Sequence, residues 1–175
     1  MWREQWERVL RHYDLFRERR RPGWRDQWAR VQRWYGRFRK TNDGRPHERE
    51  SDFYQDEVYA FFQNCHHLRD WLINDSASGL VEADLEVFVK SSDNLKLCGD
   101  LANGSKHLQL KTTWTGDKTT AFGRRMFRVH LGGTAAPIIG AQYTVESGGR
   151  TYDAFEVATA CIAEWEAYLK GKRLL

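Results

Sequence analysis

The segment SDFYQDEVYAFFQNCHHLRDWLIND, residues 51–75, decides the fold of this chain. Its apolar side chains recur at steps of four and three, the spacing that places residues on one side of an α-helix. The residues on that side are Tyr54, Val58, Phe61, Cys65, Leu68 and Leu72, and Phe62 and Ile73 widen the face. A face of this width predicts a long helix that is buried between several partners.

Two shorter helices are expected to follow the long one. The sequence Ser-Ala-Ser-Gly at 76–79 ends the long helix, and residues 80–90 form a second, acidic helix. A third helix is expected over 92–107. Its apolar side carries Leu95, Cys98, Leu101 and Ala102, while a polar line on another side carries Asp100, Asn103 and His107. The three helices together indicate a helical bundle.

Beyond residue 107 the apolar period changes to two, which predicts strands over 107–115 and 124–131. Residues 139–152 read as a hairpin with its turn at Ser147-Gly148-Gly149. A last helix is expected to begin after Asp153, with Glu156 in a capping-box position, and to end before Gly171. The predicted fold is α+β, a helical bundle with a small antiparallel sheet inserted before the last helix.

A duplicated segment precedes this domain. The sequence WREQWERVLRHYDLFR at 2–17 reappears as WRDQWARVQRWYGRFR at 24–39, with ten of sixteen positions identical. Apolar residues step by four and three in both copies, and Arg-Pro-Gly at 21–23 separates them. We therefore expect two units, a Trp/Arg-rich helical hairpin over 1–46 and the main domain over 47–175.

The basic charge belongs to the N-terminal unit. Residues 1–46 carry a net charge of +8, and residues 47–175 carry −4. One interpretation is that arginines and tryptophans of the hairpin hold RNA or an acidic protein, since arginine binds phosphates and stacks on rings. The residues singled out for this role are Arg8, Arg11, Arg30, Arg33, Trp6 and Trp28. The other interpretation is that the apolar stripes pack on the main domain and leave the arginines in solvent.

Two histidine-containing segments are the candidates for chemistry, FFQNCHHLRDWL at 61–72 and CGDLANGSKHL at 98–108. His66 and Asp70 are four residues apart, as are Asn103 and His107, so each pair shares a helix face. The predicted acid–base site contains His107, Asn103, Lys106, His66, His67 and Asp70. Two alternatives stay open: these polar groups satisfy one another in the bundle, or His66, Asp70 and His107 bind a metal.

The three cysteines, Cys65, Cys98 and Cys161, lie far apart in the chain and form no CxxC pair. They are expected to be small core residues, and we expect no metal and no cofactor. No apolar run approaches the roughly 20 residues of a membrane span, and the N-terminus lacks the apolar centre of a signal peptide. A cytoplasmic protein without membrane contact is therefore expected.

The NGSKH segment near a helix end, after a long helix with an HHLRD patch, resembles the HEPN superfamily of prokaryotic toxins and antiphage systems. NGSKH-like segments also occur in uncharacterised bacterial proteins. The resemblance covers about residues 47–108 and the last helix. It implies an RNA-directed protein that works as a homodimer and cleaves RNA without metal through an Arg-x4-6-His motif.

This chain departs from that motif, because the positions that would hold the arginine before His107 are Asp100, Leu101 and Ala102. Arg125 and His130 have the spacing, but they lie in a predicted strand. Two function classes follow. One is a HEPN-like protein of bacterial defence or stress response that acts on or binds RNA. The other is a non-catalytic interaction module whose basic hairpin docks a protein or nucleic acid.

Overall fold

The computed structural model describes residues 5, 7, 22–47, 50–107, 110–131 and 137–175. The first copy of the duplicated segment, with the candidates Trp6, Arg8 and Arg11, lies outside the described residues. The second copy lies inside them.

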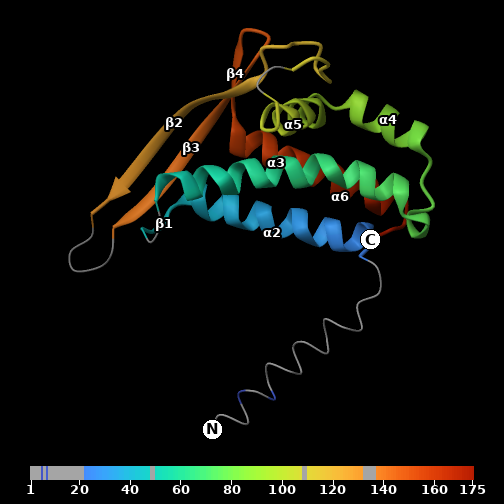
Figure 1. The fold of residues 1–175 in the computed structure, drawn as a ribbon, viewed down its shortest axis with the longest axis horizontal. Helices are drawn as coiled ribbons and strands as arrows, with labels where there is room; N and C mark the ends of the chain where they lie inside the picture. The colour runs from blue at the N-terminus through green and yellow to red at the C-terminus, as the bar shows by residue number, and fades with distance from the viewer. Residues whose placement is uncertain (1–4, 6, 8–21, 48–49, 108–109, 132–136) are drawn as a thin grey trace.

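The described chain is an α+β structure, as predicted (Figure 1). Helix α3 runs beside α2, and α5 and α6 also pack against α3. The elements in chain order are α2 (Trp24–Asp43), β1 (Arg45–Pro46), α3 (Ser51–Asn74), the 3-10 turn η1 (Ser76–Ser78), α4 (Glu82–Ser91), α5 (Asp93–Gly104), β2 (Ala121–His130), β3 (Ile138–Ser147), β4 (Arg150–Asp153) and α6 (Ala154–Gly171).

The sheet is antiparallel and is built around β3. Strand β2 pairs along β3, with Phe127 opposite Ala141, while β1 and β4 pair with the two ends of β3. The β2–β3 hairpin extends beyond the helices (Figure 1). Because β2 pairs only with β3 among the described strands, its other edge is open.

Local sequence signals account for the C-terminal elements. Gly148 and Gly149 both have positive φ, 56° and 71°, which a tight turn between β3 and β4 requires. The Asp153 carboxylate then accepts hydrogen bonds from the backbone N–H groups of Phe155 at 2.7 Å and Glu156 at 3.0 Å. These contacts cap α6, because they satisfy amides that have no partner within the first turn. The predicted turn and helix start are confirmed.

The prediction of a strand over 107–115 is wrong for the residues that are described there. Residues 110–120 form turns and bends, and α5 ends at Gly104 instead of reaching His107. The physical reason is that the Asp100 carboxylate, on α5, accepts hydrogen bonds from the backbone N–H groups of Trp114 and Thr115. A side chain thus satisfies the donors that a neighbouring strand would otherwise have paired.

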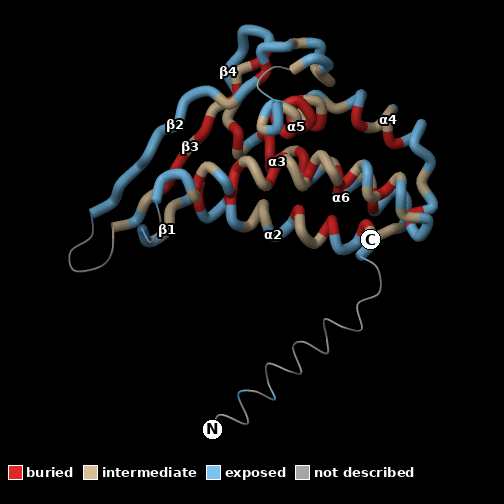
Figure 2. Tube along the Cα trace, in the orientation of Figure 1, coloured by how far each residue is buried: buried red, intermediate tan, exposed pale blue. Residues whose placement is uncertain are grey.

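One apolar core joins the second repeat copy to the main domain (Figure 2). Trp24, Trp28, Val31 and Phe38 of α2 are all buried in it, and Tyr35 stacks on Phe155 of α6 with ring centroids 5.6 Å apart. The apolar stripe of this copy therefore packs against α3 and α6. Among the described helices, none is long and apolar enough to cross a membrane.

Candidate functional site

The two histidine segments meet in the structure. Lys106, just after α5, places its Nζ atom 2.6 Å from Nε2 of His67 on α3. One turn earlier on α3, Gln63 Nε2 donates a hydrogen bond of 2.8 Å to Ser105 Oγ. Burial and the Lys106 ammonium lower the pKa of His67, so its imidazole accepts the hydrogen bond from the lysine. The contact holds the end of α5 against α3.

His66 occupies a different environment from its neighbour. Its ring meets Trp114 edge to face, with centroids 5.7 Å apart, and burial lowers its pKa to about 4. The negative charge of Asp70 opposes this lowering of the His66 pKa. The Asp70 carboxylate accepts its hydrogen bond from Arg69 Nη1, at 3.0 Å. His66 is thus a neutral, partly buried side chain at neutral pH.

Asp70 lies apart from the end of α5. It is exposed and lines a hollow of about 550 Å³ between the start of α2 and the end of α3. Arg69 joins it to α4, because the same guanidinium contacts Glu82 at 3.2 Å and Glu86 at 3.1 Å. The structure therefore brings His67 and Lys106 into direct contact, whereas Asp70 acts on His66 and His67 only through its charge and lines a different hollow.

His107 lies between two cavities at the end of α5. The larger one, of about 580 Å³, is lined by Tyr59, Leu101, Gly104, Ser105, His107, Leu110, Lys118, Thr119, Thr120, Ala121 and Phe122. The smaller one, of about 330 Å³, is lined by Asn103, His107, Leu110, Lys111 and Thr112. Asn103 and His107 thus share a cavity, as their spacing on α5 predicts. We call the two hollows together the His107 cavity.

A buried carboxylate holds the loop that lines part of this cavity. Asp100 is fully buried and accepts hydrogen bonds from Trp114 N at 2.6 Å, Thr115 N at 3.0 Å and Thr115 Oγ1 at 2.6 Å. Gly99 makes room for this loop, since a Cβ atom there would lie 2.6 Å from Cδ1 of Trp114. Of the three residues on the predicted polar line, Asp100 therefore stabilises the loop, whereas Asn103 and His107 line the cavity.

A second carboxylate, that of Asp117, connects the same loop to the sheet. Backbone N–H groups of Thr119 and Gly148 donate to Asp117 and lower its pKa. Thr120 Oγ1 lies 2.7 Å from Ser147 Oγ of β3, which fixes the loop to the sheet. Asp117 thus positions Lys118 and Thr119 at the cavity.

Sequence reasoning missed most of the residues that line the His107 cavity. Lys111 lies where the alternating pattern predicted a strand over 107–115, and Lys118, Thr119 and Thr120 lie between that segment and the next predicted strand. The Gly116-Asp117 pair was the one local signal of a turn there. Tyr59 and Phe122, which stack at 4.5 Å, come from α3 and β2 and carry no local signal of this pairing.

The N-terminal candidates that are described lie on α2. Trp28 is 4% exposed and belongs to the core, so its ring is covered by the protein itself. Arg30 Nη1 donates to Gln27 Oε1 at 2.9 Å, whereas Arg33 is exposed. Helix α3 lies between α2, the helix that carries these arginines, and α5, whose end borders the His107 cavity (Figure 1).

Strand β2 carries a basic surface away from the cavity. It begins at Ala121 and Phe122, which line the cavity, and continues through the exposed residues Arg124, Arg125 and Arg128. Exposed apolar side chains alternate with these cations, namely Met126, Phe127 and Val129. Arg125 and His130, which match the Arg-x4-6-His spacing, both lie on this strand, as predicted, and not on a helix.

The predicted metal ligands His66, Asp70 and His107 do not form a group in the described structure. The three potential ligands that do come together are Cys65, Cys98 and Cys161, whose sulfur atoms all lie within 4.8 Å of one another. Burial raises the pKa of the Cys98 and Cys161 thiols, while the neighbouring Cys161 and Cys98 groups lower the pKa of Cys65 to about 5. All three are buried, as expected for core residues.

Comparison with known proteins adds no relative from which a function could be transferred. No protein-family model, no curated protein and no solved structure matches the chain significantly, and the fold and the His107 cavity are therefore described from the chain's own residues.

Proposed function

We propose that the protein binds RNA in the His107 cavity and acts as a HEPN-like protein of bacterial defence or stress response in the cytoplasm. One observation carries this proposal: a single cavity of about 580 Å³ combines His107 and Lys118 with two stacked aromatic rings, Tyr59 and Phe122.

Each of these groups suits a single-stranded nucleic acid. Lys111 and Lys118 are exposed ammonium groups that can neutralise phosphates. Tyr59 and Phe122 offer ring faces next to them, and bases stack on aromatic rings. The arginines of β2 continue the positive charge beyond the cavity, so an RNA strand longer than the cavity meets further cations.

The proposed chemistry is metal-independent cleavage at a ribose. In it, His107 removes the proton of a 2′-hydroxyl, and the 2′-oxygen forms a bond to the adjacent phosphorus as the bond to the 5′-oxygen breaks. The leaving oxygen takes its proton from water. Asn103 shares the smaller cavity with His107, and its amide would donate to a phosphate oxygen; Lys106, held by His67, would add positive charge.

The binding step is tested with a short, fluorescently labelled single-stranded RNA titrated over a range of salt concentrations. Lys118→Ala should weaken binding and reduce the salt slope of log K by about 1, because one phosphate contact is lost. Lys90→Ala is the matched control, since Lys90 is an exposed lysine on α4 paired with Glu86 at 2.8 Å. It should leave both quantities unchanged.

Equal affinities for the two lysine variants, or no binding by the unchanged protein, would contradict the proposal. The catalytic step is tested separately by incubating total RNA and tRNA with the protein in the presence of a chelator. His107→Ala should abolish cleavage and leave binding within about threefold, because only the proton-transfer group is lost. Intact RNA with the unchanged protein would overturn the cleavage step and leave the binding step standing.

One observation favours the second function class, an interaction module without catalysis. The open edge of β2 combines three arginines with exposed Met126, Phe127 and Val129, a pattern that fits an acidic protein segment added as a further strand. A labelled acidic peptide of alternating Glu and Val tests it in the same titration. Binding should be lost in Phe127→Glu, and equal binding by both proteins would contradict it.

A further inference from the structure

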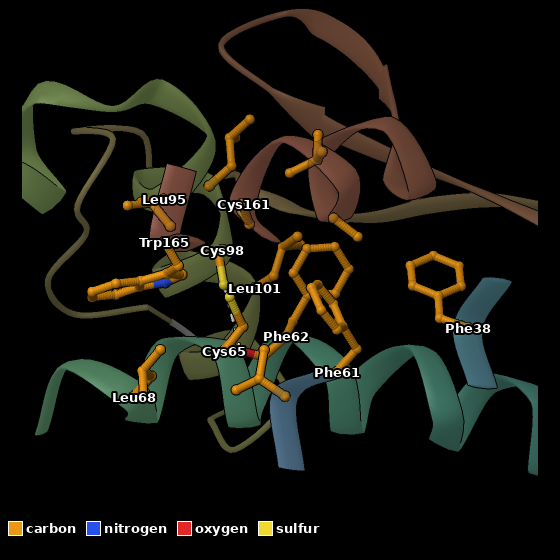
Figure 3. Close-up of a cluster of buried hydrophobic side chains, with 14 of the residues drawn as sticks. Phe38, Phe61, Phe62, Cys65, Leu68, Leu95, Cys98, Leu101, Cys161 and Trp165 are labelled. Atoms are coloured by element: carbon orange, nitrogen blue, oxygen red, sulfur yellow. Dashed lines mark hydrogen bonds between the residues drawn. The ribbon is translucent and has the colours of Figure 1, made fainter. Parts of the chain in front are cut away.

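Three cysteines from three different helices meet in the core. Cys65 lies on α3, Cys98 on α5 and Cys161 on α6, and each is at most 1% exposed. Figure 3 shows them reaching toward one another from these helices. They are all the cysteines of the chain, and their sulfur atoms lie within 4.8 Å of one another. The cluster lies on the inner side of α3, in a part of the core that the His107 cavity does not include.

The spacing of the sulfur atoms suits one metal ion. A tetrahedral zinc–thiolate centre has metal–sulfur bonds of about 2.3 Å, which places its sulfur atoms about 3.8 Å apart. The three sulfur atoms lie within 4.8 Å of one another, so small side-chain rotations would bring them to that separation. Because the three ligands come from three helices, an ion bound there would cross-link α3, α5 and α6.

A very small cavity lies beside the sulfur atoms. It has a volume of about 10 Å³ and is lined by Cys65, His66, Arg69, Val89, Leu95, Cys98 and Trp165. A space of this size accommodates about one water molecule or ion and excludes organic ligands. It also offers a place for a water molecule as the fourth ligand.

One buried N–H donor at this cavity has no acceptor. Among the described side chains, Arg69 Nε is buried and without a hydrogen-bond partner, and Arg69 lines the cavity. An unpaired buried donor is costly, and a thiolate sulfur is an acceptor that would satisfy it. A divalent ion with three thiolates carries one net negative charge, less than the three separate thiolates would carry without the ion.

We propose that Cys65, Cys98 and Cys161 form a thiolate site for a divalent, thiophilic metal ion of the Zn²⁺ type. Binding converts one M²⁺ ion and three thiols into a tris-thiolate complex of charge −1 and releases three protons, with no change of oxidation state. The softness of three sulfur ligands favours such an ion over Mg²⁺ or Ca²⁺, which prefer oxygen. The site is structural, and it stands independently of RNA binding.

The test uses the reduced full-length protein, because the buried cluster is best loaded during folding. The protein is refolded from denaturant with Cd²⁺, with Zn²⁺ or with chelator. We expect one tightly bound ion per chain, an ultraviolet sulfur-to-cadmium charge-transfer band, and a higher unfolding temperature with Zn²⁺ than with chelator. The absence of the band and of bound metal in correctly refolded protein would overturn the proposal.

Matched variants separate metal binding from core packing. Cys98→Ser keeps the shape of the side chain and should weaken Cd²⁺ binding by more than about 100-fold, as should Cys161→Ala. Val89→Ala removes methyl groups from the wall of the same cavity without removing sulfur, and it should keep the charge-transfer band. Far-ultraviolet circular dichroism identifies variants that fold.

In those folded variants, a Cd²⁺ affinity for Cys98→Ser equal to that of the unchanged protein would also overturn the proposal. The cluster would then be a set of packed thiols, in which Cys98 donates to the Phe62 carbonyl at 3.5 Å and Cys161 to the Asn94 carbonyl at 3.4 Å.

Discussion

Replacing Asp100 with alanine should lower the free energy of unfolding by about 3 kcal/mol. The carboxylate is fully buried and accepts three hydrogen bonds, from two backbone N–H groups and one hydroxyl of the 114–115 segment. Alanine leaves those donors without a partner in a place that water does not reach freely. Chemical denaturation of the two proteins measures the difference.

The same substitution should also weaken RNA binding, because Asp100 holds the loop that carries Lys118 to the His107 cavity. Asp100→Asn keeps one acceptor oxygen and should fall between alanine and the unchanged protein. Asp93→Ala is the control on the same helix: this aspartate is 92% exposed and pairs with Lys96, so its loss should cost much less stability than the loss of Asp100. Equal losses for the two alanine variants would contradict the structural role assigned to Asp100.

Replacing Glu57 with alanine should cost a similar amount, about 3 kcal/mol. Glu57 is 3% exposed and joins three elements: it accepts from Thr41 Oγ1 of α2 at 2.7 Å and pairs with Arg45 of β1 at 3.1 Å. Alanine leaves a buried hydroxyl without its acceptor and a largely covered guanidinium without its counter-charge. Thermal and denaturant unfolding measure the loss.

A double-mutant cycle isolates this interaction. In the Glu57→Ala background, Arg45→Met should restore part of the lost stability, because it removes the cation that has lost its partner. Glu166→Ala serves as the control, since Glu166 and Lys170 form an exposed pair within α6, and its loss should cost at most about 0.5 kcal/mol. Strict additivity of the Arg45 and Glu57 substitutions would show that the pair is not energetically linked.

Part of the candidate site follows from local spacing. Asn103 and His107 are four residues apart and do line one cavity, and the polar segments around His67 and Lys106 do meet. The partners across the cavity, Lys118 and Phe122, could not be predicted in this way. They reach His107 only because Asp100 and Asp117 bind the intervening loop through long-range hydrogen bonds.

The period of apolar residues determined which face of each helix is buried. It predicted helix α3 and the apolar stripe of α2. The glycines at 148–149 predicted the β3–β4 turn, and the cap at Asp153 predicted the start of α6. These features depend on neighbours in the chain, so sequence alone determines them.

Only the tertiary structure decided which buried faces meet. Three cysteines far apart in the sequence gather within 4.8 Å because α3, α5 and α6 turn their apolar sides to one core. The packing of the helices likewise places Asp70 and His107 at different hollows. A helical period specifies the direction of a side chain around its own axis, whereas its partner depends on how the helices pack and on the hydrogen bonds that hold the loops between them.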